Sequence, residues 1–342
     1  MIVQMERVIV TGGTGFLGTL IAAAFVEAGF DVTALDVVEP GSNFPAGAKF
    51  ARCDITDPVA VRAAVRGASV VVSNAALVPV TKSTAEEYMR VNLHGTRNVL
   101  SAAIDEGAYC SHVSSSAVFG EPKSVPVTNI TPITPFEDYG ASKAAGEAEV
   151  SRFRNRGLNS SILRPRTLIG EGRLGLFDII FSRIRSNKIV PLLGGGTNLF
   201  QLCDGQDFAS AVLAAVEQKA PGDYNIGALE FGTVKEDIQT LLTHAQSSSR
   251  LLPIPVWATE LSFRALQMTG LSPFSKWHWR SAYTPFYFDM EPVVAELGWT
   301  PKLSNADSMI KAYDQYISEP GPSGNSAHRT PMPGSLARLL RG

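Results

Sequence analysis

The sequence predicts an α/β fold, with a doubly wound parallel sheet and a smaller, interleaved C-terminal region. Three observations lead to this prediction. Short apolar runs alternate with helical segments through the first half of the chain, as in parallel sheets covered by helices on both faces. A glycine-rich turn follows the first of these runs. Beyond Pro165 the chain becomes rich in glycine and aromatic residues, and its 342 residues are enough for about two domains.

The predicted elements follow in chain order. Strands are expected at residues 7–10, 31–35, 49–51, 69–73, 109–114 and 159–163. Two long helices are expected at 85–106 and 139–156, where apolar residues recur near the helical period. A segment at about 200–226, with an apolar strand at 224–226, is expected to return to the first unit. The predicted organisation is therefore 1–170 plus this return segment, a second unit at 171–318, and a tail at 319–342.

The tail begins with a Pro, Gly and Ser-rich stretch that is typical of a flexible segment. Its last residues, 335–341, read Ser-Leu-Ala-Arg-Leu-Leu-Arg. They fit either a frayed terminus or a short amphipathic turn that docks on a partner or a membrane surface.

Composition and charge exclude several classes of protein. With 30 basic and 32 acidic residues the net charge is −2, so no field favours a nucleic-acid partner. Three widely spaced cysteines, Cys53, Cys110 and Cys203, predict reduced thiols and no metal site. No apolar run approaches the ~20 residues of a membrane span, and no signal peptide precedes the first strand. A cytoplasmic protein without a transmembrane segment is therefore expected.

The glycine-rich turn reads Thr-Gly-Gly-Thr-Gly-Phe-Leu-Gly at residues 11–18. Gly12 permits the tight turn, Gly15 lets the backbone approach a pyrophosphate, and Gly18 lets the next helix pack closely on the strand. The amides at the start of that helix face the phosphates. This is the dinucleotide fingerprint of a Rossmann-type sheet.

Asp36 at the end of the second strand identifies the dinucleotide. A carboxylate at this distance from the glycines accepts hydrogen bonds from the adenosine ribose and repels a 2′-phosphate. Val37, Val38 and Glu39 follow, with no cation to neutralise such a phosphate. NAD is therefore the expected cofactor, rather than NADP.

A Tyr-x-x-x-Lys motif, Tyr139 and Lys143, supplies the predicted chemistry. Two residues four apart at the start of a helix lie on one face. Lowering a phenol pKa from ~10 to ~7 requires roughly 4 kcal/mol of phenolate stabilisation, which Lys143 and an oxidised nicotinamide can supply. Tyr139 then acts as general base toward a hydroxyl or as general acid toward a ketone. Ser115, at the carboxyl end of a strand, is placed to bind the same oxygen.

These motifs together resemble the extended short-chain dehydrogenase/reductase family, and within it the NAD-dependent epimerase/dehydratase branch. The similarity extends from residue 5 to about 318. It also rests on Asp54, Asn74-Ala75-Ala76, Asn92 and Leu163-Arg164-Pro165. The resemblance implies that Asn92 supports the active-site helix and completes a catalytic set with Ser115, Tyr139 and Lys143. The cofactor-binding residues that it implies are Gly12, Thr14, Gly15, Phe16, Leu17, Gly18, Asp36, Asp54, Ile55, Ala75, Ala76, Tyr139, Lys143 and Pro165.

The resemblance also implies a substrate class and a homodimer, which would form through helices 85–106 and 139–156. Dehydratases of this branch need an extra acid and base after the serine, whereas this chain has Ser116-Ala117, so dehydration is disfavoured. A nucleotide sugar, epimerised through a transient ketone, is the leading expectation. The candidate substrate-binding residues are Ser115, Ser116, Thr167, Arg173, Gln201 and Arg280.

Two alternatives remain open. In nucleotide-sugar members of the family, Asn often occupies the position of Thr167, and an Arg that binds the diphosphate often occupies the position of Leu199. With nine aromatic residues between Trp257 and Phe288, which either pack a small core or line a pocket, these differences favour a hydroxysteroid-like or other alcohol dehydrogenase or ketoreductase with net NAD turnover. A catalytically silent NAD-sensing protein is the minor alternative.

Overall fold

The computed structural model describes residues 5–79, 83–170, 173–175, 177–268, 280 and 282–318. The expected flexible tail at 319–342 lies outside them. The central element is a seven-stranded parallel sheet in the order β10-β6-β5-β4-β1-β2-β3. All six strands predicted in the first half are present, with ends displaced by one or two residues. The strands are β1 Arg7–Thr11, β2 Asp31–Asp36, β3 Lys49–Arg52, β4 Val70–Ser73, β5 Tyr109–Val113, β6 Ser160–Pro165 and β10 Gly222–Ile226.

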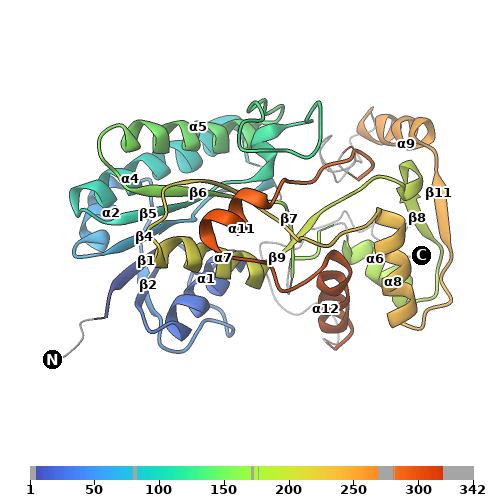
Figure 1. Cartoon of the computed structure of the whole chain (residues 1–342), viewed down its shortest axis with the longest axis horizontal. Helices are drawn as coiled ribbons and strands as arrows, with labels where there is room; N and C mark the ends of the chain where they lie inside the picture. The colour runs from blue at the N-terminus through green and yellow to red at the C-terminus, as the bar shows by residue number, and fades with distance from the viewer. Residues whose placement is uncertain are drawn as a thin grey trace.

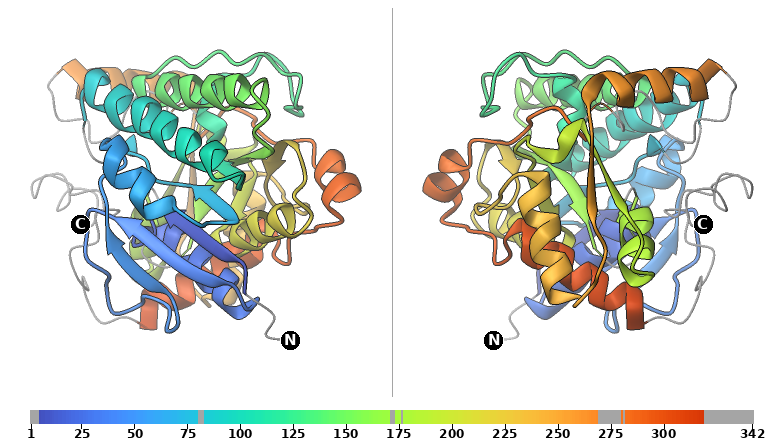
Figure 2. Two further views of the ribbon diagram at one scale, coloured as in Figure 1. Left: turned by 90° about the vertical axis from the view of Figure 1, so that its left-hand side faces the viewer. Right: turned by 90° about the vertical axis from the view of Figure 1, so that its right-hand side faces the viewer.

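Helices cover both faces of this sheet (Figure 1). On one face lie α1 Phe16–Glu27 and α7 Gly205–Glu217, and on the other α2 Pro58–Val65, α4 Thr96–Asp105 and α5 Asp138–Arg154. Because successive strand residues point to opposite faces, Val8 and Val10 pack with α1 and α7, whereas Ile9 packs with α2 and α4. Burial on both faces explains why the strands are almost continuously apolar. Figure 2 shows the two helical layers around the twisted sheet.

The helix expected at 85–106 consists of three segments. It begins as α3 Ala85–Tyr88, where Thr84 and Glu87 form a capping box. It continues as a π-helical segment, Met89–Gly95, and then as α4. Such wider turns are rare and are frequently found at functional sites. Here the wider turn contains Asn92, whose side chain is completely buried.

Two later segments return to the sheet. The expected one contains α7, which lies beside α1, and β10, which pairs with β6. Its first strand, β9 Leu202–Asp204, lies outside the central sheet and pairs with residues 167–169. The second is residues 286–299, including α11 Glu291–Leu297. It was assigned from sequence to the smaller unit, but its apolar side chains share a core with those of α1 and α7. Phe286 and Phe288 are buried there with Phe119, so these two aromatic residues belong to the larger core. Phe274, Trp277 and Trp279 lie outside the described residues.

The smaller unit has a core of its own, formed by Phe181, Leu241, Tyr313 and their neighbours. It comprises α6 Phe177–Arg185, α8 Val234–His244, α9 Val256–Met268, α12 Asn305–Ser318 and two short parallel pairs, β7 Thr167–Ile169 with β9 and β8 Val190–Leu193 with β11 Leu251–Ile254. No helix among the described residues has the length and apolar character needed to cross a bilayer.

Candidate active site

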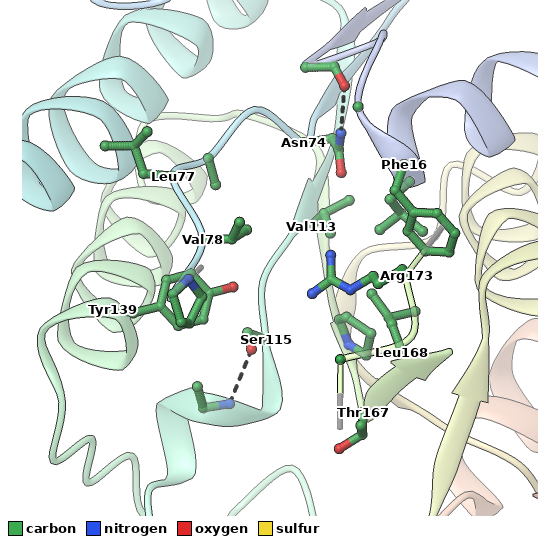
Figure 3. Close-up of a pocket in the computed structure, with 18 of the residues that line it drawn as sticks. Phe16, Asn74, Leu77, Val78, Val113, Ser115, Tyr139, Thr167, Leu168 and Arg173 are labelled. Carbon is green, nitrogen blue, oxygen red and sulfur yellow. Dashed lines mark hydrogen bonds between the residues drawn. The ribbon is translucent and has the colours of Figure 1, made fainter. Parts of the chain in front are cut away.

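A cavity of about 1240 Å³ opens at the carboxyl ends of the central strands and continues into the smaller unit. Its volume exceeds the ~300–1000 Å³ that is usual for a small-molecule site, so it has room for two ligands side by side. Figure 3 shows part of it, with Tyr139 and Ser115 on one wall and Phe16, Leu168, Thr167 and Arg173 on the other. Both units therefore contribute to one site.

The glycine turn has no space for side chains at Gly12, Gly13 and Gly18. Gly12 has a φ of +64°, and a Cβ there would lie 2.7 Å from the Ala75 Cα. A Cβ on Gly18 would lie 2.0 Å from the Gly12 carbonyl oxygen. Because α1 starts directly after Gly15, its first amides are available to an anion in the cavity. The turn thus fits a pyrophosphate, and Gly12, Thr14, Gly15, Phe16 and Leu17 line the cavity.

Asp36 lies at the far end of the cavity and organises the loop around it. Its Oδ2 accepts a hydrogen bond from the Thr14 amide at 3.2 Å, and its Oδ1 accepts from the amides of Val37 at 2.8 Å and Val38 at 3.1 Å. Arg52, which the sequence reasoning did not consider, is nearby, but it pairs with Glu39 at 2.6 Å. Asp54, Ile55, Ala75 and Ala76 line the same end.

Ser115 and Tyr139 come from two elements that meet at the sheet edge. Ser115 follows β5 and caps a 3₁₀ turn, where its Oγ accepts from the Ala117 amide at 3.2 Å. Tyr139 is in the first turn of α5, and its ring lies 6.0 Å, edge to face, from that of Tyr88. Burial raises the Tyr139 pKa above its usual value of 10.0, while the Ser115 hydroxyl and the Arg173 guanidinium act in the opposite direction.

Lys143 lies one turn further along α5, with 2% of its surface exposed. Its Nζ donates to the Val113 carbonyl at 2.7 Å. Burial lowers its pKa to about 8, although the Glu147 carboxylate opposes that change. The groups that oppose the rise of the Tyr139 pKa in this structure are Ser115 and Arg173. The effect of Lys143 together with a bound nicotinamide stays a prediction.

The buried ammonium makes a prediction for stability against pH. The Lys143 pKa falls from 10.5 in the unfolded chain to about 8 in the folded protein. Below pH 8 both states are charged and the full cost of burial applies, whereas above 10.5 both are neutral, so stability rises with pH between these values. We expect wild type to gain about 2 kcal/mol relative to Lys143→Met between pH 7 and pH 10. Urea unfolding at both pH values measures this, and a constant difference would contradict it.

Asn92 lies behind the cavity, outside the residues that line it. Its Oδ1 accepts from the Leu77 amide at 2.7 Å, and its Nδ2 donates to the Leu77 carbonyl at 3.0 Å and the Ser142 Oγ at 2.9 Å. Asn92 thus joins the loop after β4 to α5, between Tyr139 and Lys143. Asn92 is therefore a positioning residue that supports the active-site helix through Ser142, the role that the resemblance implies.

The structure separates the candidate substrate-binding residues into two groups. Ser115, Ser116, Thr167, Arg173 and the cofactor-site Pro165 line the cavity. Gln201 and Arg280 do not, and the expectation for both is corrected. The Gln201 side chain is fully buried and joins backbone segments, donating to the Ala228 carbonyl at 2.6 Å and accepting from the Phe288 amide at 2.9 Å. Arg280 pairs with Glu121 at 3.1 Å and lines a smaller cavity that adjoins the main one at Phe136 and Glu137.

Arg166 lines the cavity and was missed by sequence reasoning. Its guanidinium lies between the rings of Phe200 and Phe286, at 4.7 and 4.0 Å from their centroids. It donates to the Phe286 carbonyl at 3.0 Å and to the Thr167 Oγ1 at 2.9 Å. A cation at the end of an apolar strand was the only available signal. Among the described residues, no three His, Cys, Asp or Glu side chains are grouped to hold a metal ion.

The sheet and its glycine-lined cavity are those of a Rossmann-type enzyme that binds a dinucleotide. The chain belongs to the NAD-dependent epimerase/dehydratase family, whose model matches residues 8–227. This family forms a branch of the extended short-chain dehydrogenases/reductases, and NAD is its cofactor.

Several proteins are similar to this chain in sequence, and one solved structure is similar in fold. An uncharacterised protein, y4nG, of Sinorhizobium fredii is 38% identical over 98% of this chain and 86% of its own. A putative UDP-glucose 4-epimerase of Methanocaldococcus jannaschii is 31% identical over 62% and 74%. A 2-alkyl-3-oxoalkanoate reductase of Stenotrophomonas maltophilia is 28% identical over 87% and 96%. UDP-glucose 4-epimerase of Thermotoga maritima, solved with UDP-glucose, superposes with a TM-score of 0.74 at 22% identity, over 92% and 99%.

Proposed function

We propose that the protein transfers a hydride between NAD and a secondary alcohol or the corresponding ketone, with Tyr139 moving the hydroxyl proton. The observation that carries this proposal is the meeting of Ser115 and Tyr139 in the cavity that the glycine turn enters. Open α/β sheets bind their ligands at this edge. When bound, NAD supplies the hydride acceptor.

Each of these residues has a distinct role in the proposal. Ser115 binds the substrate oxygen, and Tyr139 takes its proton in oxidation or donates one in reduction. Lys143, held by the Val113 carbonyl, binds the nicotinamide ribose and keeps a positive charge near the phenol. Asp36 and the glycine turn hold the adenosine ribose and the pyrophosphate.

For the substrate, the lining of the cavity in the smaller unit favours an alcohol or ketone with an apolar body. The side chains there are mostly aliphatic or aromatic, namely Leu168, Leu174, Phe177, Ile180, Phe200, Ile238 and Met309. Such a lining stabilises apolar surface and leaves sugar hydroxyls without partners. The reductase relative, which is named for an alkyl oxo acid, covers most of this chain. We therefore place this alternative ahead of the nucleotide sugar that the sequence favoured.

A nucleotide-sugar epimerase is the second candidate. The Methanocaldococcus relative supports it, as does Arg173, which extends into the cavity toward Tyr139 (Figure 3). Two residues considered for diphosphate binding count against it, because position 199 is a leucine and Arg280 lines another cavity.

We also propose a homodimer formed through α4 and α5. Sedimentation at several protein concentrations tests this part of the proposal.

An absorbance assay separates the candidates. We expect the purified protein to oxidise NADH with 3-oxodecanoate, one NADH for each ketone reduced. Product from UDP-glucose without net NADH would instead favour the epimerase. No product and no change in NADH with any secondary alcohol, ketone or UDP-sugar would contradict the proposal and leave the silent NAD-binding alternative.

A further inference from the structure

Arg166 is a buried cation whose charge no acidic residue neutralises within the described part of the chain. Only 2% of its surface is exposed, and the salt bridges formed among the described residues do not include it. Its Nη2 is buried and has no hydrogen-bond partner. An uncompensated buried charge costs several kcal/mol. The rings of Phe200 and Phe286 offset part of this cost.

Burial lowers the Arg166 pKa to about 9, so the group keeps its positive charge at neutral pH. The nearest titratable groups do not alter this result, because burial alone accounts for the change. The acid on the smaller unit's side of the cavity, Asp237, accepts hydrogen bonds from Asn305 and the Gly232 amide instead. The charge of Arg166 is therefore available to a ligand.

A hydrogen bond to Thr167 connects the Arg166 guanidinium to the surface of the cavity. Arg166 donates its Nη1 hydrogen to the Thr167 Oγ1 at 2.9 Å, and a guanidinium cannot accept a hydrogen bond. The hydroxyl hydrogen of Thr167 must therefore point elsewhere, and this side chain lines the cavity. A hydroxyl that accepts from a cation is a stronger donor, and it favours a negatively charged oxygen.

We propose that Arg166 and Thr167 form a subsite for an anionic oxygen of the substrate, a carboxylate or a phosphate. Next to it, Leu168, Leu174, Phe177 and Ile180 bind an apolar body. The substrate class is then an amphipathic acid that carries the reacting hydroxyl or ketone. This inference rests on the proposed function and names its substrate.

Binding measurements test the subsite independently of turnover. Calorimetry on the NAD-loaded protein compares 3-hydroxydecanoate with its methyl ester, and UDP with uridine. A charge-assisted hydrogen bond contributes about 1.5–3 kcal/mol, so the charged member of one pair should bind about 10- to 100-fold more tightly. The pair that shows the difference identifies a carboxylate or a phosphate.

Thr167→Val, which keeps the shape and removes the hydroxyl, should abolish that preference and leave the neutral ligand's affinity unchanged. Arg166→Met should do the same, whereas Arg185→Met, at an exposed position on α6, should leave the preference intact. Thr167→Val keeps the test valid if Arg166→Met fails to fold. Three results would each overturn the subsite. They are equal binding of both members of each pair, no binding of either charged ligand, and a preference for the charged ligand that persists in Thr167→Val. Loss of turnover in Tyr139→Phe is a separate result that bears on the proposed function.

Discussion

Tyr139→Phe is expected to reduce kcat/KM by about 10²–10⁴-fold, the usual contribution of a positioned general acid or base. The change removes one oxygen and keeps the ring that packs on Tyr88. Because the glycine turn and Asp36 are untouched, the affinity for NAD should stay within about twofold. Steady-state kinetics and calorimetric NAD titration measure the two quantities.

Tyr88→Phe is the matched control, because it removes a phenol hydroxyl just outside the proposed proton path. That hydroxyl donates to the Val78 carbonyl at 3.3 Å, and we expect its loss to change kcat/KM by less than about tenfold. Full activity in Tyr139→Phe would assign the proton transfer to another group.

Glu147→Gln is expected to lower the free energy of unfolding by about 3–5 kcal/mol, the usual cost of breaking a buried ion pair. Glu147 is 3% exposed. Its carboxylate accepts two hydrogen bonds from Arg164, both at 2.8 Å, and one from the Ser114 Oγ at 2.5 Å. In this variant, the buried Arg164 guanidinium keeps one acidic partner among the described residues, Asp223, whose side chain is partly exposed. Urea unfolding provides the measurement.

Two variants control for this effect. Arg152→Gln removes an exposed partner of Glu149 on the same helix, and we expect a loss below about 1 kcal/mol. The double variant Glu147→Met with Arg164→Met removes both buried charges and should recover most of the stability. If Glu147→Gln and Arg152→Gln lowered the free energy of unfolding equally, the buried ion pair would contribute no more to stability than the exposed one.

The fold and the cofactor end of the site were largely predictable, because local rules determine them. The strands are short apolar runs. Gly12 is required by its positive φ of +64°, and Gly18 by its contact with the Gly12 carbonyl six residues earlier. Asp36 is recognisable from its distance along the chain. In the same way, Tyr139 and Lys143 are one helical turn apart, so their common face follows from sequence spacing alone.

The parts that could not be predicted depend on contacts between distant residues. Arg166 becomes a buried cation only because Phe200 and Phe286 enclose it from segments 34 and 120 positions away. Gln201 was predicted to bind substrate, but its side chain instead accepts a hydrogen bond from the Phe288 amide, 87 positions away. The π-helical turn at Asn92 likewise depends on the loop at Leu77 and on Ser142.

The phenol of Tyr139 is the group on which the proposed chemistry depends. Its pKa is raised above 10.0 by burial in this structure, and a bound nicotinamide cation should lower it toward neutrality. A pH titration of tyrosinate absorbance, taken as the difference between wild type and Tyr139→Phe, measures it with and without NAD⁺. We predict a clear downward shift of the Tyr139 pKa when NAD⁺ is bound. An unchanged titration curve would contradict the assignment of Tyr139 as the proton-transferring group.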